Sequence, residues 1–157
     1  MPTTRPATTN DAAAIVALWN TRTADPDSCW YQSPQANVPF IEGLMSQGFT
    51  FAVVEDGEPV GFGFWRGAEL IALCGPTSDI YYAAMLAYAT DAVAHGAGRC
   101  TIGVRETNEM SWMNSLGVVT TTPIGFDPLP PDADPETRVP NLLEVTADLA
   151  ALLQAVQ

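Results

Sequence analysis

Three strand-like segments in succession, followed by a long helix-forming segment, constrain this sequence more than any other feature. Residues 49–54 and 59–66 are rich in β-branched and aromatic side chains. They flank Asp56-Gly57, a pair typical of tight hairpin turns because glycine accepts a positive φ. Residues 68–74 form a mainly apolar run, which predicts a central strand buried on both faces. Together the three segments predict a β-meander.

A long helix is expected directly after this meander. The Pro-Thr-Ser-Asp sequence at 76–79 supplies cap chemistry for a helix over 80–95, which Gly96 ends. A strand over 100–105 follows, so the meander feeds a β-α-β crossover. The apolar spacing predicts that the inward stripe of the helix consists of Tyr82, Leu86, Ala89 and Val93.

Weaker patterns predict the remaining elements. They are strands over 3–7, 118–122 and 141–146, and helices from Ala12 onward and over 40–47, 109–116 and 148–156. The order β-α-α-β-β-β-α-β-α-β-β-α predicts an α/β fold with a mixed sheet and helices on both faces. We expect a single domain over 1–157, with a proline- and acid-rich loop at 127–140 and a terminal helix at 148–157.

Two segments leave alternatives open. Residues 23–39 predict a loop because several X-Pro pairs interrupt regular structure, and Cys29-Trp30-Tyr31 lies within it. This aromatic segment either packs over the core or lines a substrate cleft. The terminal helix carries an apolar face that either docks on its own domain or pairs in a homodimer.

Charge and composition exclude several classes of function. The chain has six arginines, no lysine and 18 acidic residues, for a formal net charge of −12. Lysine Schiff-base chemistry is therefore excluded, and the negative field disfavours nucleic acid and membrane surfaces as partners. One histidine, His95, and three separated cysteines predict no metal site and reduced thiols. No signal-peptide pattern or membrane-length apolar run is present, so we expect a cytoplasmic protein.

At several points the sequence resembles the GNAT acyltransferase superfamily. Arg5-Pro6-Ala7-Thr8 together with residues 11–19 is similar to that family's first strand and helix, and residues 51–62 to its second and third strands. Ala94-His95-Gly96 before a strand, and Asn108 followed by Leu116-Gly117-Val118, resemble later landmarks. The resemblance covers roughly residues 3–122 and implies the GNAT fold.

The resemblance also implies acyl transfer from acetyl-CoA to an amine of a small molecule or peptide. In this family the pantetheine arm lies where the fourth and fifth strands splay apart, and the diphosphate meets amides at the start of the long helix. Glu69 would then be the general base acting through water, and Tyr81 or Tyr82 would protonate the leaving thiolate. The positions implied for cofactor binding are Leu73, Cys74, Gly75, Thr77, Ser78 and Asn108.

The sequence departs from the family pattern at both ends of the donor site. Residues 75–84 lack the arginine and the glycines of the family's Arg-Gly-x-Gly-x-Gly/Ala loop. Asp79 would instead place a carboxylate where the diphosphate should lie, and Met113 falls where the family commonly has its acidic tyrosine. Two alternatives to the acetyl-CoA enzyme therefore stay open. One is a catalytically inactive GNAT-fold protein that binds a partner, and the other is an enzyme with a different acyl donor.

Overall fold

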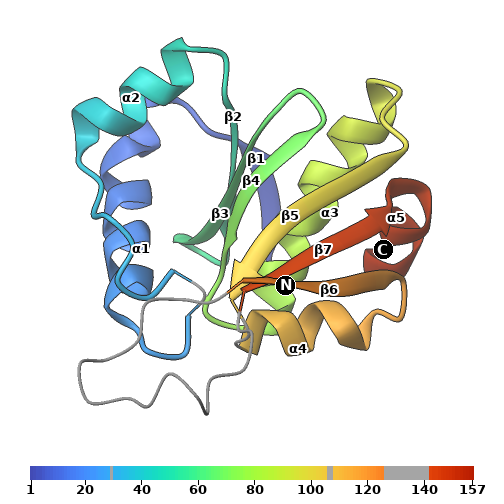
Figure 1. The fold of residues 1–157 in the computed structure, drawn as a ribbon. Coiled ribbons are helices and arrows are strands. Elements are labelled where there is room, and N and C mark those ends of the chain that lie inside the picture. Colours follow the sequence, from blue (N-terminus) through green and yellow to red (C-terminus); the bar gives the residue numbers. More distant parts are fainter. Residues whose placement is uncertain (29, 106–107, 126–141) are drawn as a thin grey trace, which may run out of the picture.

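In the computed structural model the strands form two antiparallel sheets, and helices pack around them (Figure 1). The structure describes residues 1–28, 30–105, 108–125 and 142–157, without the side chains of 103–105, 108 and 142. The predicted loop at 127–140 lies outside these residues. The predicted order of elements is confirmed, with a short 3₁₀ turn at Thr9–Asp11 added before the first helix.

The first sheet contains four strands in the order of the chain. They are β1 (Thr3–Pro6), β2 (Thr50–Glu55), β3 (Pro59–Arg66) and β4 (Glu69–Cys74). The hairpin between β2 and β3 is confirmed, and Gly57 in its turn has a φ of 80°. Such a backbone conformation is open to glycine at little steric cost, which explains why the Asp-Gly signal located this turn.

Two helices, α1 (Ala12–Ala24) and α2 (Val38–Ser46), cover one face of this sheet. Ile15 and Ile41 pack there against phenylalanines of β2 and β3. The prediction that residues up to 39 form a loop is wrong at its end. Pro39 lies in the first turn of α2, where no helical N–H is needed, and the Asn37 side chain caps the helix by accepting from the Phe40 N–H at 2.9 Å.

The long helix α3 (Ser78–Ala94) covers the opposite face. The predicted inward stripe is wrong in most positions, since only Ala89 of its four members is buried. The helix contacts the first sheet, α4 and α5, so apolar residues surround it and their spacing does not single out one face. The buried residues are Ile80, Tyr81, Ala84, Met85, Tyr88, Ala89 and Ala92.

The second sheet holds the last three strands in the order β5-β7-β6. These are β5 (Arg99–Arg105), β6 (Val119–Gly125) and β7 (Leu142–Asp148), with α4 (Asn108–Ser115) between β5 and β6. The terminal helix α5 (Leu149–Val156) packs on α3 and buries Leu149 and Leu152. Its apolar face is thus covered by its own domain, and the homodimer stays a prediction.

Strand β4 is not the central strand that its apolar sequence predicts. It pairs with β3 on one edge, and no described strand pairs with its other edge. Its apolar character comes from packing on both faces, with Leu73 in the core on the α3 side and Cys74 in the core on the α1 side. Among the described residues, no helix is long and apolar enough to cross a membrane.

Candidate functional site

The two sheets meet at a gap between β4 and β5. These strands lie close together, yet within the described residues no hydrogen-bond ladder joins them. Each is the edge strand of its own sheet, so peptide groups of both face the gap without a strand partner. An extended ligand with amide groups can bond to such edges as an added strand would.

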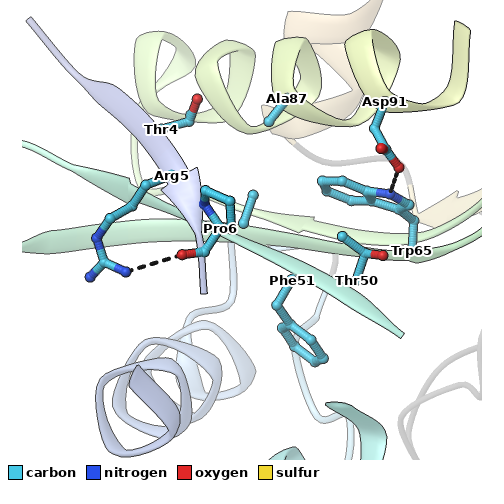
Figure 2. A pocket seen from close by; sticks show the side chains of 9 residues that line it. Thr4, Arg5, Pro6, Thr50, Phe51, Trp65, Ala87 and Asp91 are labelled. Carbon is cyan, nitrogen blue, oxygen red and sulfur yellow. Dashed lines mark hydrogen bonds between the residues drawn. The ribbon is translucent and has the colours of Figure 1, made fainter. Parts of the chain in front are cut away.

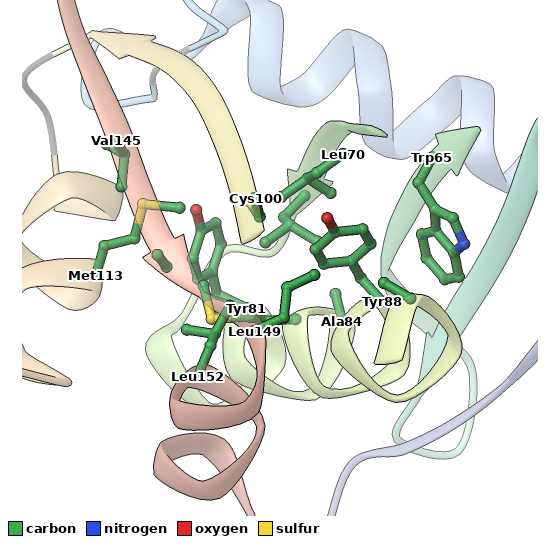
Figure 3. Packing of buried hydrophobic residues seen from close by; sticks show 14 of the residues in the cluster. Trp65, Leu70, Tyr81, Ala84, Tyr88, Cys100, Met113, Val145, Leu149 and Leu152 are labelled. Atoms are coloured by element: carbon green, nitrogen blue, oxygen red, sulfur yellow. The ribbon is translucent and has the colours of Figure 1, made fainter. Parts of the chain in front are cut away.

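Core side chains fill part of the space beside this gap. The Tyr88 hydroxyl donates to the carbonyl oxygen of Ala68, just before β4, at 2.6 Å, and it is also hydrogen-bonded to the Cys100 thiol of β5. Leu70 lies next to both side chains (Figure 3). Burial is the main reason that the pKa of the Tyr88 phenol and that of the Cys100 thiol are raised. Both groups are therefore neutral near pH 7 and serve to hold the sheets together.

The turn from β4 to α3 is packed too closely to leave room for a side chain at Gly75. A Cβ on this residue would lie 2.8 Å from the Tyr81 backbone nitrogen and 2.9 Å from Ile80 Cγ2. The Ile80 side chain also covers Gly61 of β3, where a Cβ would lie 2.5 Å from the same methyl carbon. These two glycines therefore let the start of α3 approach the sheet directly.

Two polar side chains, Thr77 and Asp79, lie at the N-terminus of α3. Thr77 occupies the cap position, and its carbonyl oxygen accepts from the Tyr81 N–H at 3.0 Å. The Thr77 hydroxyl donates to the Asp79 carboxylate. This bond, followed by the influence of the nearby backbone N–H groups of Ile80 and Asp79, lowers the pKa of Asp79, so the carboxylate is ionised at neutral pH.

This cap does not fit a diphosphate. The amides that attract phosphate at a helix N-terminus already have the Asp79 carboxylate beside them, and a second anion at the same place is repelled. Ser78 is half-buried in the first turn, and the stretch from Gly75 to His95 contains no arginine or lysine to offset the repulsion. The roles of Gly75, Thr77 and Ser78 in donor binding stay predictions. In the structure these residues form the turn from β4 into α3.

The two tyrosines predicted as acids have different surroundings. Tyr81 is 2% exposed and packs against the Trp112 ring, with ring centroids 5.5 Å apart, beside Met113 and Val145 (Figure 3). The Tyr82 hydroxyl donates to the Trp112 carbonyl oxygen at 2.7 Å and lies 2.8 Å from the Ser115 hydroxyl. Both tyrosines therefore connect α3 to α4. Met113 is buried in the core at the position where the resemblance puts a tyrosine.

The other predicted residues do not share one surface. Glu69 is exposed at the first position of β4, opposite Arg66 of β3. Leu73 and Cys74 are both buried, but successive strand residues point to opposite faces, and the Cys74 thiol lies 4.0 Å from the Leu18 carbonyl oxygen of α1. Only their peptide groups can face the gap together. Asn108 begins α4, and its side chain lies outside the described part of the chain.

Sequence reasoning missed a buried ion pair that joins α1 to α4. The Arg22 guanidinium donates to the Glu109 carboxylate, and it also donates to Asp25 at 2.9 Å. The side chains of Arg22 and Glu109 are 9% and 2% exposed, and Arg22 Nε has no hydrogen-bond partner in the described structure. Eighty-seven positions separate the two residues, so no local pattern links them.

The segment between α1 and α2 is expected from its sequence either to pack over the core or to line a substrate cleft. Trp30 is buried against Trp19 and Phe62, with ring centroids 4.8 and 5.7 Å away, so this part of the aromatic segment packs over the core. Cys29 lies outside the described residues.

A cavity of about 350 Å³ lies beside this segment, and none of the residues described as lining it is charged. It is lined by Trp19, Ser33, Pro34, Gln35, Asn37 and Phe40.

Comparison with known proteins identifies the fold. No family model matches the sequence, and no curated protein matches it. Among solved structures, yncA from Salmonella typhimurium, solved with its cofactor acetyl-CoA, has a TM-score of 0.66 at 18% identity and covers 95% of this chain and 94% of its own. The ribosomal-protein-S18-alanine N-acetyltransferase from Escherichia coli has a TM-score of 0.67 at 12% identity, with 95% and 94% covered.

A third structure is the spermidine N-acetyltransferase from Vibrio cholerae in complex with CoA and spermine. Its TM-score is 0.66 at 14% identity, and 97% of this chain and 98% of that chain are covered. The matches span nearly the full length of both chains. This chain therefore has the GNAT acetyltransferase fold.

Proposed function

We propose that this protein transfers an acyl group from a pantetheine thioester, acetyl-CoA being the simplest, to the amine of a small molecule or peptide. The observation that carries the proposal is that β4 and β5 face each other across a gap and that, in the described part of the chain, no strand pairs with either of these edges. Pantetheine is an extended chain with two amide groups, so it suits a site built from strand edges. The acetyltransferases of this fold that are solved with acetyl-CoA or CoA support the same donor class.

The chemistry requires little from side chains. A neutral amine attacks the thioester carbon, a C–N bond forms, the C–S bond breaks, and the proton lost by nitrogen balances the one taken up by the thiolate. Strand N–H groups at the gap would stabilise the oxyanion. In this proposal Glu69, exposed at the start of β4, accepts the amine proton through water. The resemblance gives the proton for sulfur to Tyr81 or Tyr82; because the Tyr82 hydroxyl donates to the Trp112 carbonyl oxygen and Tyr81 is buried in the core, either side chain would have to leave its present position to do so.

The cap on α3 determines how the donor is recognised in this proposal. Because Asp79 occupies the helix N-terminus, the diphosphate of CoA contributes little to binding there. Calorimetric titration with acetyl-CoA and with S-acetylpantetheine, which has no phosphate, measures this directly. We expect the two dissociation constants to agree within about threefold. If neither compound binds at concentrations up to millimolar, the proposal is overturned.

Two variants refine this titration. Asp79→Asn should raise the affinity for acetyl-CoA and leave that for S-acetylpantetheine unchanged, because only the former carries the diphosphate. Asp56→Asn, in the exposed turn between β2 and β3, changes the net charge equally and serves as the control. If both variants improve acetyl-CoA binding to the same extent, the effect is one of overall charge and the role given to Asp79 is refuted.

Turnover identifies the acceptor and the base. Thiol release from acetyl-CoA can be followed with a panel of amines, beginning with spermine, which the Vibrio cholerae structure contains, and with short peptides bearing a free N-terminus. Glu69→Gln should lower kcat, because the amide cannot accept the amine proton. Full turnover by this variant would remove Glu69 as the base.

A second candidate function is a GNAT-fold protein that binds a partner without acyl transfer. Two observations favour it: Asp79 occupies the phosphate-binding end of α3, and Met113 is buried where the resemblance expects a tyrosine. This candidate predicts that neither thioester binds and that no amine releases thiol. The titration and turnover experiments therefore separate the two functions.

A further inference from the structure

A cavity of about 200 Å³ lies on the α3 side of the first sheet (Figure 2). No residue of β4 or β5 is among those described as lining it. It is bounded by β1, the start of β2, the end of β3 and the second half of α3. An apolar cavity of about 150 Å³ accommodates benzene, so this one is large enough for a small organic molecule. Two small residues, Ala52 and Ala87, are among those that line it.

Its walls are mostly apolar, and the one anionic side chain among the described lining residues is held in place. The ring of Trp65 and the side chain of Pro6 line the cavity together with the two alanines. The Trp65 indole N–H donates to Asp91 Oδ2 at 2.7 Å, which fixes the carboxylate at the cavity rim. The other oxygen of Asp91 lies 3.4 Å from Nδ1 of His95, whose side chain is 69% exposed on the solvent side.

The guanidinium group of Arg5 points away from the cavity and is paired with carboxylates. Arg5 is the only cation among the described lining residues, and its side chain extends away from the cavity (Figure 2). Its guanidinium bonds to Asp11 at 2.7 Å and to Glu55 at 2.8 Å. Since both carboxylates engage Arg5, the charge that the cavity presents is that of Asp91. An anionic ligand is therefore disfavoured.

We propose that this cavity binds a small organic cation, an ammonium group with short apolar substituents. The substituents would contact Trp65, Pro6 and the two alanines, and the charge would lie near the Asp91 carboxylate. An indole ring attracts an adjacent cation through its quadrupole, which adds to the attraction of the carboxylate. The net charge of −12 raises the local concentration of such cations. This site is independent of the acyl-transfer site and does not depend on the proposed function.

Choline and its neutral isostere 3,3-dimethylbutan-1-ol test the proposal. The indole N–H resonance of Trp65, assigned by its loss in Trp65→Phe, is followed by two-dimensional NMR of the ¹⁵N-labelled protein during titration. We expect choline to shift this resonance in a saturable manner and to bind at least about tenfold more tightly than the isostere. Equal binding of the two, or no saturable shift of this resonance with choline, would overturn the proposal.

Three variants locate the site. Asp91→Asn keeps an oxygen that can accept from Trp65 but removes the charge, and it should abolish the preference for choline. Glu42→Gln, exposed on α2 over the opposite face, removes the same charge and should change nothing. Ala87→Leu fills the cavity and should abolish binding of both compounds. If Glu42→Gln weakens choline binding as much as Asp91→Asn does, attraction by overall charge explains the binding and the proposed site is refuted.

Discussion

Replacing Gly75 by alanine tests the close approach of α3 to the sheet, on which the donor end of the site depends. The added Cβ would lie 2.8 Å from the Tyr81 backbone nitrogen and 2.9 Å from Ile80 Cγ2. Gly75 has no positive φ, so alanine adds no backbone strain and the cost is steric. Because the nearest atom belongs to the backbone of a buried helical turn, the contact cannot be relieved by a side-chain rotation. Overpacking of this kind costs about 1–3 kcal/mol.

Thermal and urea unfolding, followed by circular dichroism, measure this cost. Each kcal/mol corresponds to a fall in Tm of roughly 2–4 °C for a chain of this size. Gly43→Ala is the matched control, because Gly43 lies within α2 and a Cβ there meets no atom within 4 Å. This control should stabilise the protein by about 0.5–1 kcal/mol through helix propensity.

A second glycine makes the prediction stricter. Gly61→Ala would place a Cβ 2.5 Å from Ile80 Cγ2 and 2.6 Å from the Cys74 carbonyl oxygen, so it should also destabilise. Because Gly61 and Gly75 contact the same Ile80 side chain, the double variant should lose less stability than the sum of the two single variants. If Gly75→Ala is as stable as the wild type, or if it stabilises as Gly43→Ala does, the packing argument is refuted.

Three further predictions concern buried and paired polar groups. Arg22→Met should lower the free energy of unfolding by about 3–5 kcal/mol, because it removes the cation that faces the buried Glu109 carboxylate; urea denaturation checks this. Asp11→Asn should destabilise at pH 7 by about 1–2 kcal/mol, since hydrogen bonds from Arg5 lower the pKa of Asp11 from 3.8 to about 2. This contribution is present above pH 4 and disappears as pH falls toward 2, so the unfolding free energies of variant and wild type should converge there. Tyr88→Phe should cost about 1–3 kcal/mol, because the carbonyl before β4 loses its 2.6 Å bond, and a loss below 0.5 kcal/mol would contradict the role given to this hydroxyl.

Local sequence signals predicted the order of the elements well. Gly57 in the β2–β3 turn and Gly96 after α3 have positive φ values that few residues adopt, and the segment before α3 carries residue types typical of helix starts, so all three signals can be recognised within one segment. Pro39 misled the prediction because the same residue that ends a helix is also accepted in the first helical turn.

The candidate site was predictable only in part. The resemblance located the segments, and the structure places Asp79 at the helix N-terminus as the sequence suggested. The resemblance did not predict that Leu73 and Cys74 lie in the cores on opposite faces of the sheet, or that the Tyr82 hydroxyl bonds to α4. Those facts depend on which elements pack on each face, and that packing is not encoded within any one segment.

By itself, the sequence determined the alternation of strands and helices, the absence of lysine and the acid at the start of α3, because each is a property of a residue and its near neighbours. Only the tertiary structure decided that β4 and β5 lie side by side with no ladder between them in the described residues, that Arg22 meets Glu109, and that Ala52, Ala87 and Asp91 line a cavity. Pairing, burial and cavities arise between segments distant in the chain, and their geometry follows from how complete side chains fill the shared space.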